Sequence, residues 1–99
     1  MKLTIIPEDN AIVKDGNGLL FSNNLNDYIS SSIPSDVHAL QWEENSGEIE
    51  YVEHGRANES ISVLPDWANE CVTLHSTTIT QLENELTESV NTSNTDISG

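Results

Sequence analysis

The stretch Ile33–Tyr51, which reads I-P-S-D-V-H-A-L-Q-W-E-E-N-S-G-E-I-E-Y, decides the fold of this 99-residue chain. Apolar and polar residues alternate on both sides of an Asn-Ser-Gly at positions 45–47. Alternation with a period of two residues is typical of a β-strand with one buried face, and Asn and Gly favour the tight turn between paired strands. We therefore predict a central β-hairpin over residues 37–53.

Strict alternation assigns the side chains of this hairpin to two faces. It places His38, Leu40 and Trp42 on one face of the first strand, whereas Ile49 and Tyr51 share a face of the return strand. If Trp42 lies opposite Ile49 or Tyr51, that contact contributes roughly 0.2–1 kcal/mol beyond simple burial. We expect the apolar residues on these faces to form the core.

Short strands are also predicted before the hairpin. Residues 3–6 are apolar and largely β-branched and stop at a proline, which cannot donate to a β-ladder. Residues 11–14 and 19–21 flank Asp15-Gly16-Asn17-Gly18, whose residue types tolerate positive φ and so favour a turn. Residues 54–61 read as a loop. The front of the chain thus predicts a small antiparallel sheet of four to five strands.

Helical spacing replaces strand alternation after residue 64. One apolar stripe with three- and four-residue steps comprises Leu64, Trp67, Cys71 and Leu74. It predicts a short helix whose Trp67 joins the core. A capping-box pattern at residues 78–81 then opens a second stripe, which comprises Ile79, Leu82, Leu86 and Val90. This second stripe either packs on the sheet, binds a groove in a partner, or pairs with a second copy of the chain.

These elements predict an α+β fold with one or two C-terminal helices. We divide the chain into a compact domain over residues 1–76, an amphipathic helix over residues 77–90 and a disordered tail over residues 91–99. The tail has one isolated apolar residue and cannot offset the entropy of ordering.

The charge of the chain restricts its partners. It has 17 acidic and three basic residues, a formal net charge of −14. Such a chain is repelled by phosphate backbones and anionic membranes, so we expect neither nucleic acid nor a membrane as a direct partner. The predicted protein-contact surface combines the hairpin glutamates with the second helical stripe. Its residues are Glu43, Glu44, Glu48, Glu50, Glu53, Leu82, Leu86 and Val90.

No constellation of catalytic or metal-binding residues stands out. Cys71 and His75 are four residues apart and would share a helix face, but Cys71 belongs to an apolar stripe, where a small buried thiol is the simpler interpretation. The three histidines have no spacing typical of zinc ligands. The single cysteine cannot form an internal disulfide and fits a reducing compartment. We therefore predict a non-enzymatic protein without cofactor or metal.

Three features together resemble a family of small phage proteins encoded near tail-fibre genes, described as tail-fibre assembly or tail assembly chaperone-like proteins. These features are I-I-P-E-D at residues 5–9, D-G at residues 15–16, and P-S-D-V-H-A-L-Q-W followed by G-E-I-E-Y at residues 34–51. The likeness covers residues 1–54 and brings no catalytic residues. Beyond residue 60 the family varies, so the likeness assigns no role to the C-terminal region.

The resemblance implies a phage protein made in the cytoplasm of an infected bacterium. We expect it to bind a tail-fibre or tail subunit during assembly, or to join the virion as a minor component. The C-terminal helix also offers a route to homo-oligomers. The alternative is an acidic inhibitor that imitates nucleic acid and binds a host nucleic-acid-binding protein.

Overall fold

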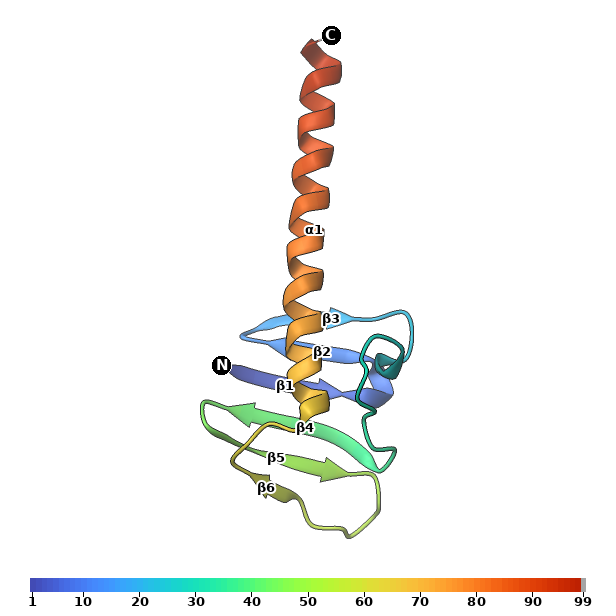
Figure 1. The fold of residues 1–99 in the computed structure, drawn as a ribbon, viewed down its shortest axis with the longest axis vertical. Helices are drawn as coiled ribbons and strands as arrows, with labels where there is room; N and C mark the ends of the chain where they lie inside the picture. The colour runs from blue at the N-terminus through green and yellow to red at the C-terminus, as the bar shows by residue number, and fades with distance from the viewer. Residues whose placement is uncertain (99) are drawn as a thin grey trace.

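The computed structural model describes the backbone of residues 1–98 and the side chains of residues 1–85. It has the expected α+β class, with one antiparallel sheet and one C-terminal helix (Figure 1). Two short 3-10 turns, η1 (Pro7–Asp9) and η2 (Leu25–Asp27), lie in the connections. The main elements are β1 (Lys2–Ile6), β2 (Ala11–Lys14), β3 (Asn17–Leu20), β4 (Val37–Glu43), β5 (Ser46–Tyr51), β6 (Glu59–Ile61) and α1 (Asp66–Ser98).

The six strands form an open sheet in the order β3-β2-β1-β4-β5-β6. Four to five strands were expected, and the additional one is β6, which lies in the stretch predicted as a loop. Its pairing with β5 joins Ile61 to Gly47 and Glu59 to Ile49. A three-residue edge strand with a single apolar side chain is too short to display alternation, which explains why its sequence gave no strand signal.

The central hairpin is formed by β4 and β5, in which Leu40 lies opposite Ile49 and Trp42 opposite Gly47. The predicted pairing of Trp42 with Ile49 or Tyr51 is therefore wrong. The turn lies one residue earlier than expected, because Glu43 pairs with Ser46. Glu44 then takes a left-handed conformation with φ of 59°.

An irregularity in the pairing between Val37 and Ala39 changes which side chains point inward. Val37 and Leu40 are both buried, although they are three residues apart, and His38 is exposed. A β-bulge produces this effect because one extra residue breaks the strict alternation. The prediction that His38 shares the inner face of Leu40 and Trp42 is thus wrong.

The core lies between one face of the sheet and the first turns of α1. Among the predicted core residues, Leu40, Trp42, Ile49 and Trp67 are buried, and Tyr51 is half-buried against them. Neighbouring strands and the helix add Leu3, Ile5, Ile12, Ala68 and Cys71 to the core, which also contains Val37 and, from the β3–β4 connection, Leu25 and Ile33.

One continuous helix replaces the two segments predicted around residues 64–74 and 77–90. Pro65 precedes α1, and neither proline nor glycine interrupts residues 66–98. Nothing in the backbone chemistry therefore forces a break near residue 76. The helix also continues through residues 91–98, where we predicted a disordered tail, and Gly99 lies outside the described residues. The division into three parts stays a prediction.

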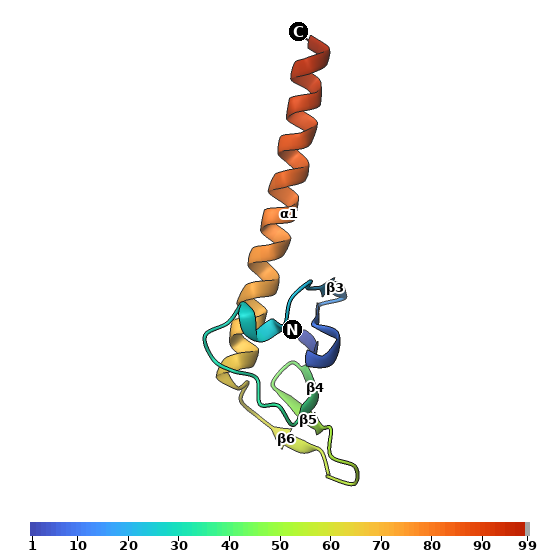
Figure 2. The ribbon, with the colours of Figure 1, turned by 90° about the vertical axis from the view of Figure 1, so that its right-hand side faces the viewer.

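Only the first part of α1 lies on the sheet. Figures 1 and 2 show the rest of the helix standing away from the strands. This gives the molecule extents of 64 × 26 × 21 Å. His75 is the last buried residue among those whose side chains are described. We call residues 76–98 the projecting segment.

Candidate partner-binding surfaces

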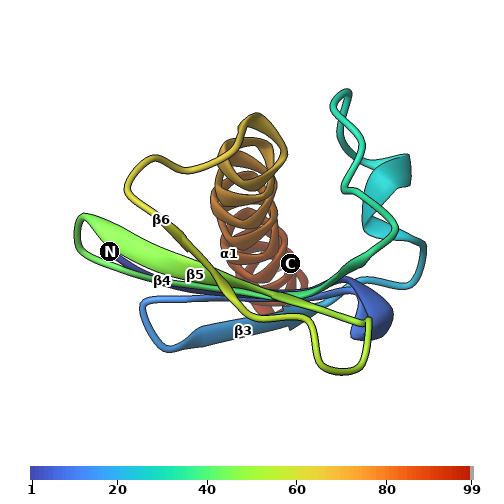
Figure 3. The ribbon, with the colours of Figure 1, turned by 90° about the horizontal axis from the view of Figure 1, so that it is seen from below.

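The outer face of the sheet, turned away from α1, carries part of the predicted acidic surface. Partners in an antiparallel pair share a face. Glu48 lies opposite the exposed Gln41, and Glu43, two residues further along β4, shares that face. Glu50 also points outward and is half-buried. Figure 3 shows the helix on the other side of the strands, so these carboxylates face solvent.

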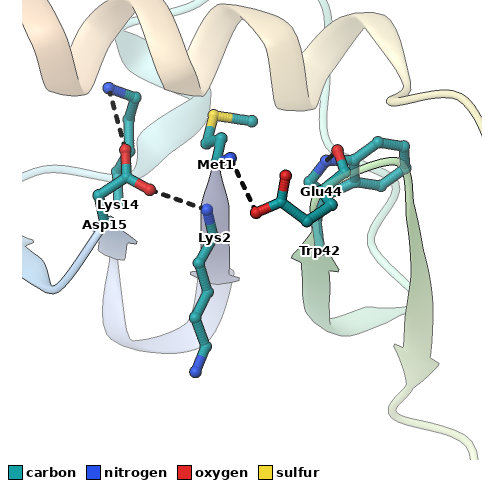
Figure 4. A network of polar contacts seen from close by, with 6 residues as sticks. All are labelled: Met1, Lys2, Lys14, Asp15, Trp42 and Glu44. Carbon is teal, nitrogen blue, oxygen red and sulfur yellow. Dashed lines mark hydrogen bonds and ion pairs between the residues drawn. The ribbon is translucent and has the colours of Figure 1, made fainter.

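Glu44 is a turn residue with structural contacts of its own (Figure 4). Its amide donates to the carbonyl of Met1 at 2.9 Å, and its own carbonyl accepts from Trp42 Nε1 at 3.0 Å. The Met1 amino group lies 3.9 Å from the Glu44 carboxylate. These contacts fix the hairpin turn against the start of β1. Glu53 follows β5 in an exposed stretch, so the structure does not gather all five predicted glutamates on one face.

The three basic side chains neutralise little of the acidic surface. Lys14 Nζ lies 3.8 Å from Asp15 Oδ2 on the next residue. Asp15 also accepts the backbone N–H of Lys2, and this hydrogen bond lowers the pKa of its carboxyl group. The Lys2 side chain shares the outer face with Glu43, its partner in the ladder. Arg56 is held elsewhere.

Arg56 closes a polar cluster at the end of the hairpin. It donates to Asp36 Oδ2 at 2.7 Å, and its guanidinium lies 3.5 Å from the centroid of the Tyr51 ring. The Tyr51 hydroxyl donates to Glu59 Oε1 at 2.6 Å, which raises the pKa of Tyr51. The hydrogen bond to Asp36 likewise raises the pKa of Arg56. These contacts attach the β5–β6 connection to the sheet, so the only arginine serves the fold.

Glu70 attaches the connection before β4 to the helix. Its carboxylate accepts the backbone N–H groups of Ser30 at 3.0 Å and Ser31 at 2.8 Å, together with the Ser30 hydroxyl. Hydrogen bonds from both serines lower the pKa of Glu70 to about 2, because they favour the charged carboxylate. An open groove of about 580 Å³ lies beside these hydrogen bonds, between Tyr28 and Leu74.

The Cys71–His75 pair is part of the core. Cys71 has 0% and His75 2% of its surface exposed. Burial raises the pKa of the thiol to about 12, so the reactive thiolate is suppressed. His75 Nε2 lies 2.7 Å from the carbonyl oxygen of Asn17. A carbonyl only accepts, so Nε2 is the donor and the ring connects α1 to β3. Within the described residues no group of acidic, His or Cys side chains is arranged to hold a metal ion.

The helical stripe of the predicted surface lies on the projecting segment. Leu82 is 48% exposed, and residues 81–85 are all exposed. Leu82 therefore does not pack on the sheet, which removes one of the three interpretations for this residue. The side chains of Leu86 and Val90 lie outside the described residues.

Comparison with known proteins gives no relative. No family model, no curated protein and no solved structure matches the chain. Within the described part of the chain, no helix has the length and apolar character needed to cross a bilayer.

Proposed function

We propose that this protein is a non-enzymatic, acidic binding protein of phage origin that assists the assembly of a tail or tail fibre, or joins the particle as a minor component. It acts in the cytoplasm of the infected bacterium. Its partner is a tail-fibre or tail subunit, and it binds neither nucleic acid nor a membrane directly.

The position of Leu82 is the observation that carries a contact role. This leucine belongs to an apolar stripe at helical spacing, yet nearly half of its surface faces solvent. An exposed large apolar side chain on an amphipathic helix is typical of a segment that lies in a groove of another protein.

The phage assignment is supported by the sequence motifs. The V-H-A-L-Q-W and G-E-I-E-Y elements supply the buried Leu40, Trp42 and Ile49 of the hairpin. The D-G element supplies the turn between β2 and β3, where Asp15 and Gly16 have φ of 50° and 85°. The resemblance therefore lies in residues that build the fold. It supports a common origin with the phage family but does not identify the partner, which depends on the surface residues.

Affinity capture from infected cells tests this proposal. The tagged full chain, a Leu82→Ala variant and a Gln81→Ala variant are compared, because Gln81 is the exposed neighbour of Leu82 and lies off the stripe. We expect the wild type and Gln81→Ala to recover a tail-fibre or tail subunit and Leu82→Ala to recover much less. Recovery of host proteins alone, or equal recovery with all three baits, would contradict the proposal.

The outer face of the hairpin favours a second candidate, an acidic inhibitor that imitates nucleic acid. Glu43 and Glu48 lie on adjacent strands and point the same way, and the net charge is −14. Competition with DNA distinguishes the assembly function from the inhibitor function. DNA should displace a nucleic-acid-binding enzyme held by a mimic, and Glu43→Gln with Glu48→Gln should weaken that complex. A tail subunit bound through Leu82 should resist both changes.

A further inference from the structure

We infer that the projecting segment of α1 binds a protein groove with an apolar floor and a Lys/Arg-rich rim, and that it does not pair with a second copy of this chain. This inference rests on the proposed contact function and adds the chemistry of the partner. Three observations carry it: the low burial of the segment's described residues, the helix-forming tendency of the sequence, and the distribution of charge.

The first observation is the change in burial along α1. On the sheet, Trp67, Ala68, Cys71 and His75 are buried at three- and four-residue steps. Between residues 76 and 85 no side chain is buried, and residues 81–85 are exposed throughout. Most of the stability of a helix in a protein comes from packing one of its faces. Thr78 and Ile79 are half-buried, and Ile79 lines a hollow together with Lys14 and Asn17. Among the described residues, the sheet therefore covers α1 as far as residue 79 and leaves residues 81–85 exposed.

The second observation is the composition of the projecting segment. It contains six threonines, four serines and three asparagines among residues 76–98, and no alanine. These residue types are less favourable than alanine by up to about 0.7 kcal/mol each in a helix. The Thr78 and Thr80 hydroxyls donate to the carbonyls of Leu74 and Ser76 at 2.7 and 3.0 Å, a contact that slightly destabilises helices. A helix of this composition is only weakly stable in water by itself, so packing against a partner would add to its stability.

The third observation is charge. The sequence contains no lysine or arginine after Arg56, whereas the segment carries four acidic residues, Glu83, Glu85, Glu88 and Asp96. Pairing of two copies would bring together two segments of the same negative charge, neither of which contains a lysine or arginine, and like charges in an interface cost several kcal/mol. Self-pairing helices normally flank their apolar seam with residues of both signs. A groove with basic residues along its rim instead complements both the apolar stripe and the negative charge of the segment.

A synthetic peptide tests the inference without the natural partner. The probe is a labelled amphipathic peptide with a leucine face and a lysine face, and its matched control has glutamate in place of lysine. Binding to the full-length protein is measured by fluorescence anisotropy at a salt concentration of about 0.15 M, where long-range charge effects are largely screened. Leu82→Ala, Gln81→Ala and the Glu43→Gln/Glu48→Gln double variant are compared.

We expect the lysine peptide to bind the wild type and Gln81→Ala equally, and the glutamate peptide not to bind. Leu82→Ala should weaken binding by about tenfold, the loss expected when one leucine no longer becomes buried. The double variant on the sheet should bind nearly as well as the wild type. Binding that ignores Leu82, or that is lost in the double variant, would overturn the inference because the contact would then lie on the sheet.

Sedimentation of the protein alone tests whether the projecting segment pairs with a second copy of the chain. We expect a monomer at all accessible concentrations. A dimer that dissociates in Leu82→Ala and forms in Gln81→Ala would show that a second copy occupies the stripe. The proposed function has a separate outcome: capture of a tail subunit through Leu82 with no binding of the lysine peptide would reject only the chemistry of the partner.

Discussion

Gly47 offers the most direct check on the register of the central hairpin. It lies opposite Trp42 on the inner face of the sheet. A methyl group at this position would overlap the carbonyl oxygen of Gln41 and lie 2.9 Å from Trp42 Cα and 3.0 Å from Trp42 Cε3. The first two are backbone atoms, which cannot move without distorting the ladder. We therefore expect Gly47→Ala to cost about 2–3 kcal/mol, the upper part of the range for overpacked sites.

Gly18 provides the matched control, since it is also a strand glycine. A methyl group there would meet only Val13 Cγ2, at 3.7 Å, which is ordinary van der Waals contact. Gly18→Ala should leave stability unchanged or raise it by about 0.5 kcal/mol, because alanine restricts the unfolded chain.

Urea unfolding followed by the fluorescence of the two tryptophans measures both variants. With an m-value of about 1–2 kcal/mol/M for a chain of this size, Gly47→Ala should lower the midpoint by roughly 1–3 M. The midpoint of Gly18→Ala should stay at or slightly above that of the wild type. Equal midpoints for the two variants would refute the pairing of Gly47 with Trp42.

Two further predictions concern titratable groups. Glu70→Gln should destabilise the protein near neutral pH. The pKa of Glu70 is depressed, so its hydrogen bonds with the serines stabilise the fold at pH values above its ordinary pKa of 4.5. This contribution disappears as the pH falls from 4.5 towards about 2. Unfolding in urea at successive pH values should show the free energies of unfolding of the two proteins converging over that interval. A constant difference would contradict a stabilising contact between Glu70 and the serines. The buried thiol of Cys71, with its pKa of about 12, should react with a disulfide reagent at pH 8 only as fast as the protein unfolds. Native-state labelling at the rate of a free cysteine would contradict its burial.

The features that could be predicted from the sequence have local signals. Alternation around residues 45–47 indicated the hairpin. Asp15-Gly16 indicated a turn because these residue types tolerate positive φ, and both positions do have positive φ in the structure. The stripe of Leu64, Trp67, Cys71 and Leu74 indicated a helix that packs on the core. Each of these signals lies within one element and depends on the residue types themselves.

The features that were missed depend on distant parts of the chain. The exposure of His38 follows from a bulge that only the pairing of β4 with β5 reveals. β6 exists because the edge of β5 is free to pair. Glu70 lies 40 residues from Ser30, so no local pattern could join them. In each case a tertiary contact decides the local structure.

The exposure of the candidate surface residues could be predicted in part. Glu43 and Glu48 lie on one exposed face as alternation requires, and Leu82 is exposed; their role in binding stays a prediction. Glu44 was chosen for its charge, but its backbone holds the hairpin turn. The spacing of apolar residues could not reveal that α1 extends beyond the edge of the sheet, because the length of the helix and the width of the sheet are set by different parts of the chain.

Amide hydrogen exchange of the full chain tests most directly whether the projecting segment depends on a partner. We predict strong protection for residues 70–75, which lie on the sheet, and rapid exchange for residues 81–85, which are exposed, in the protein alone. Residues 81–85 should become protected when the lysine peptide is added. Equal protection of both segments in the free protein would contradict the claim that this part of α1 needs a partner.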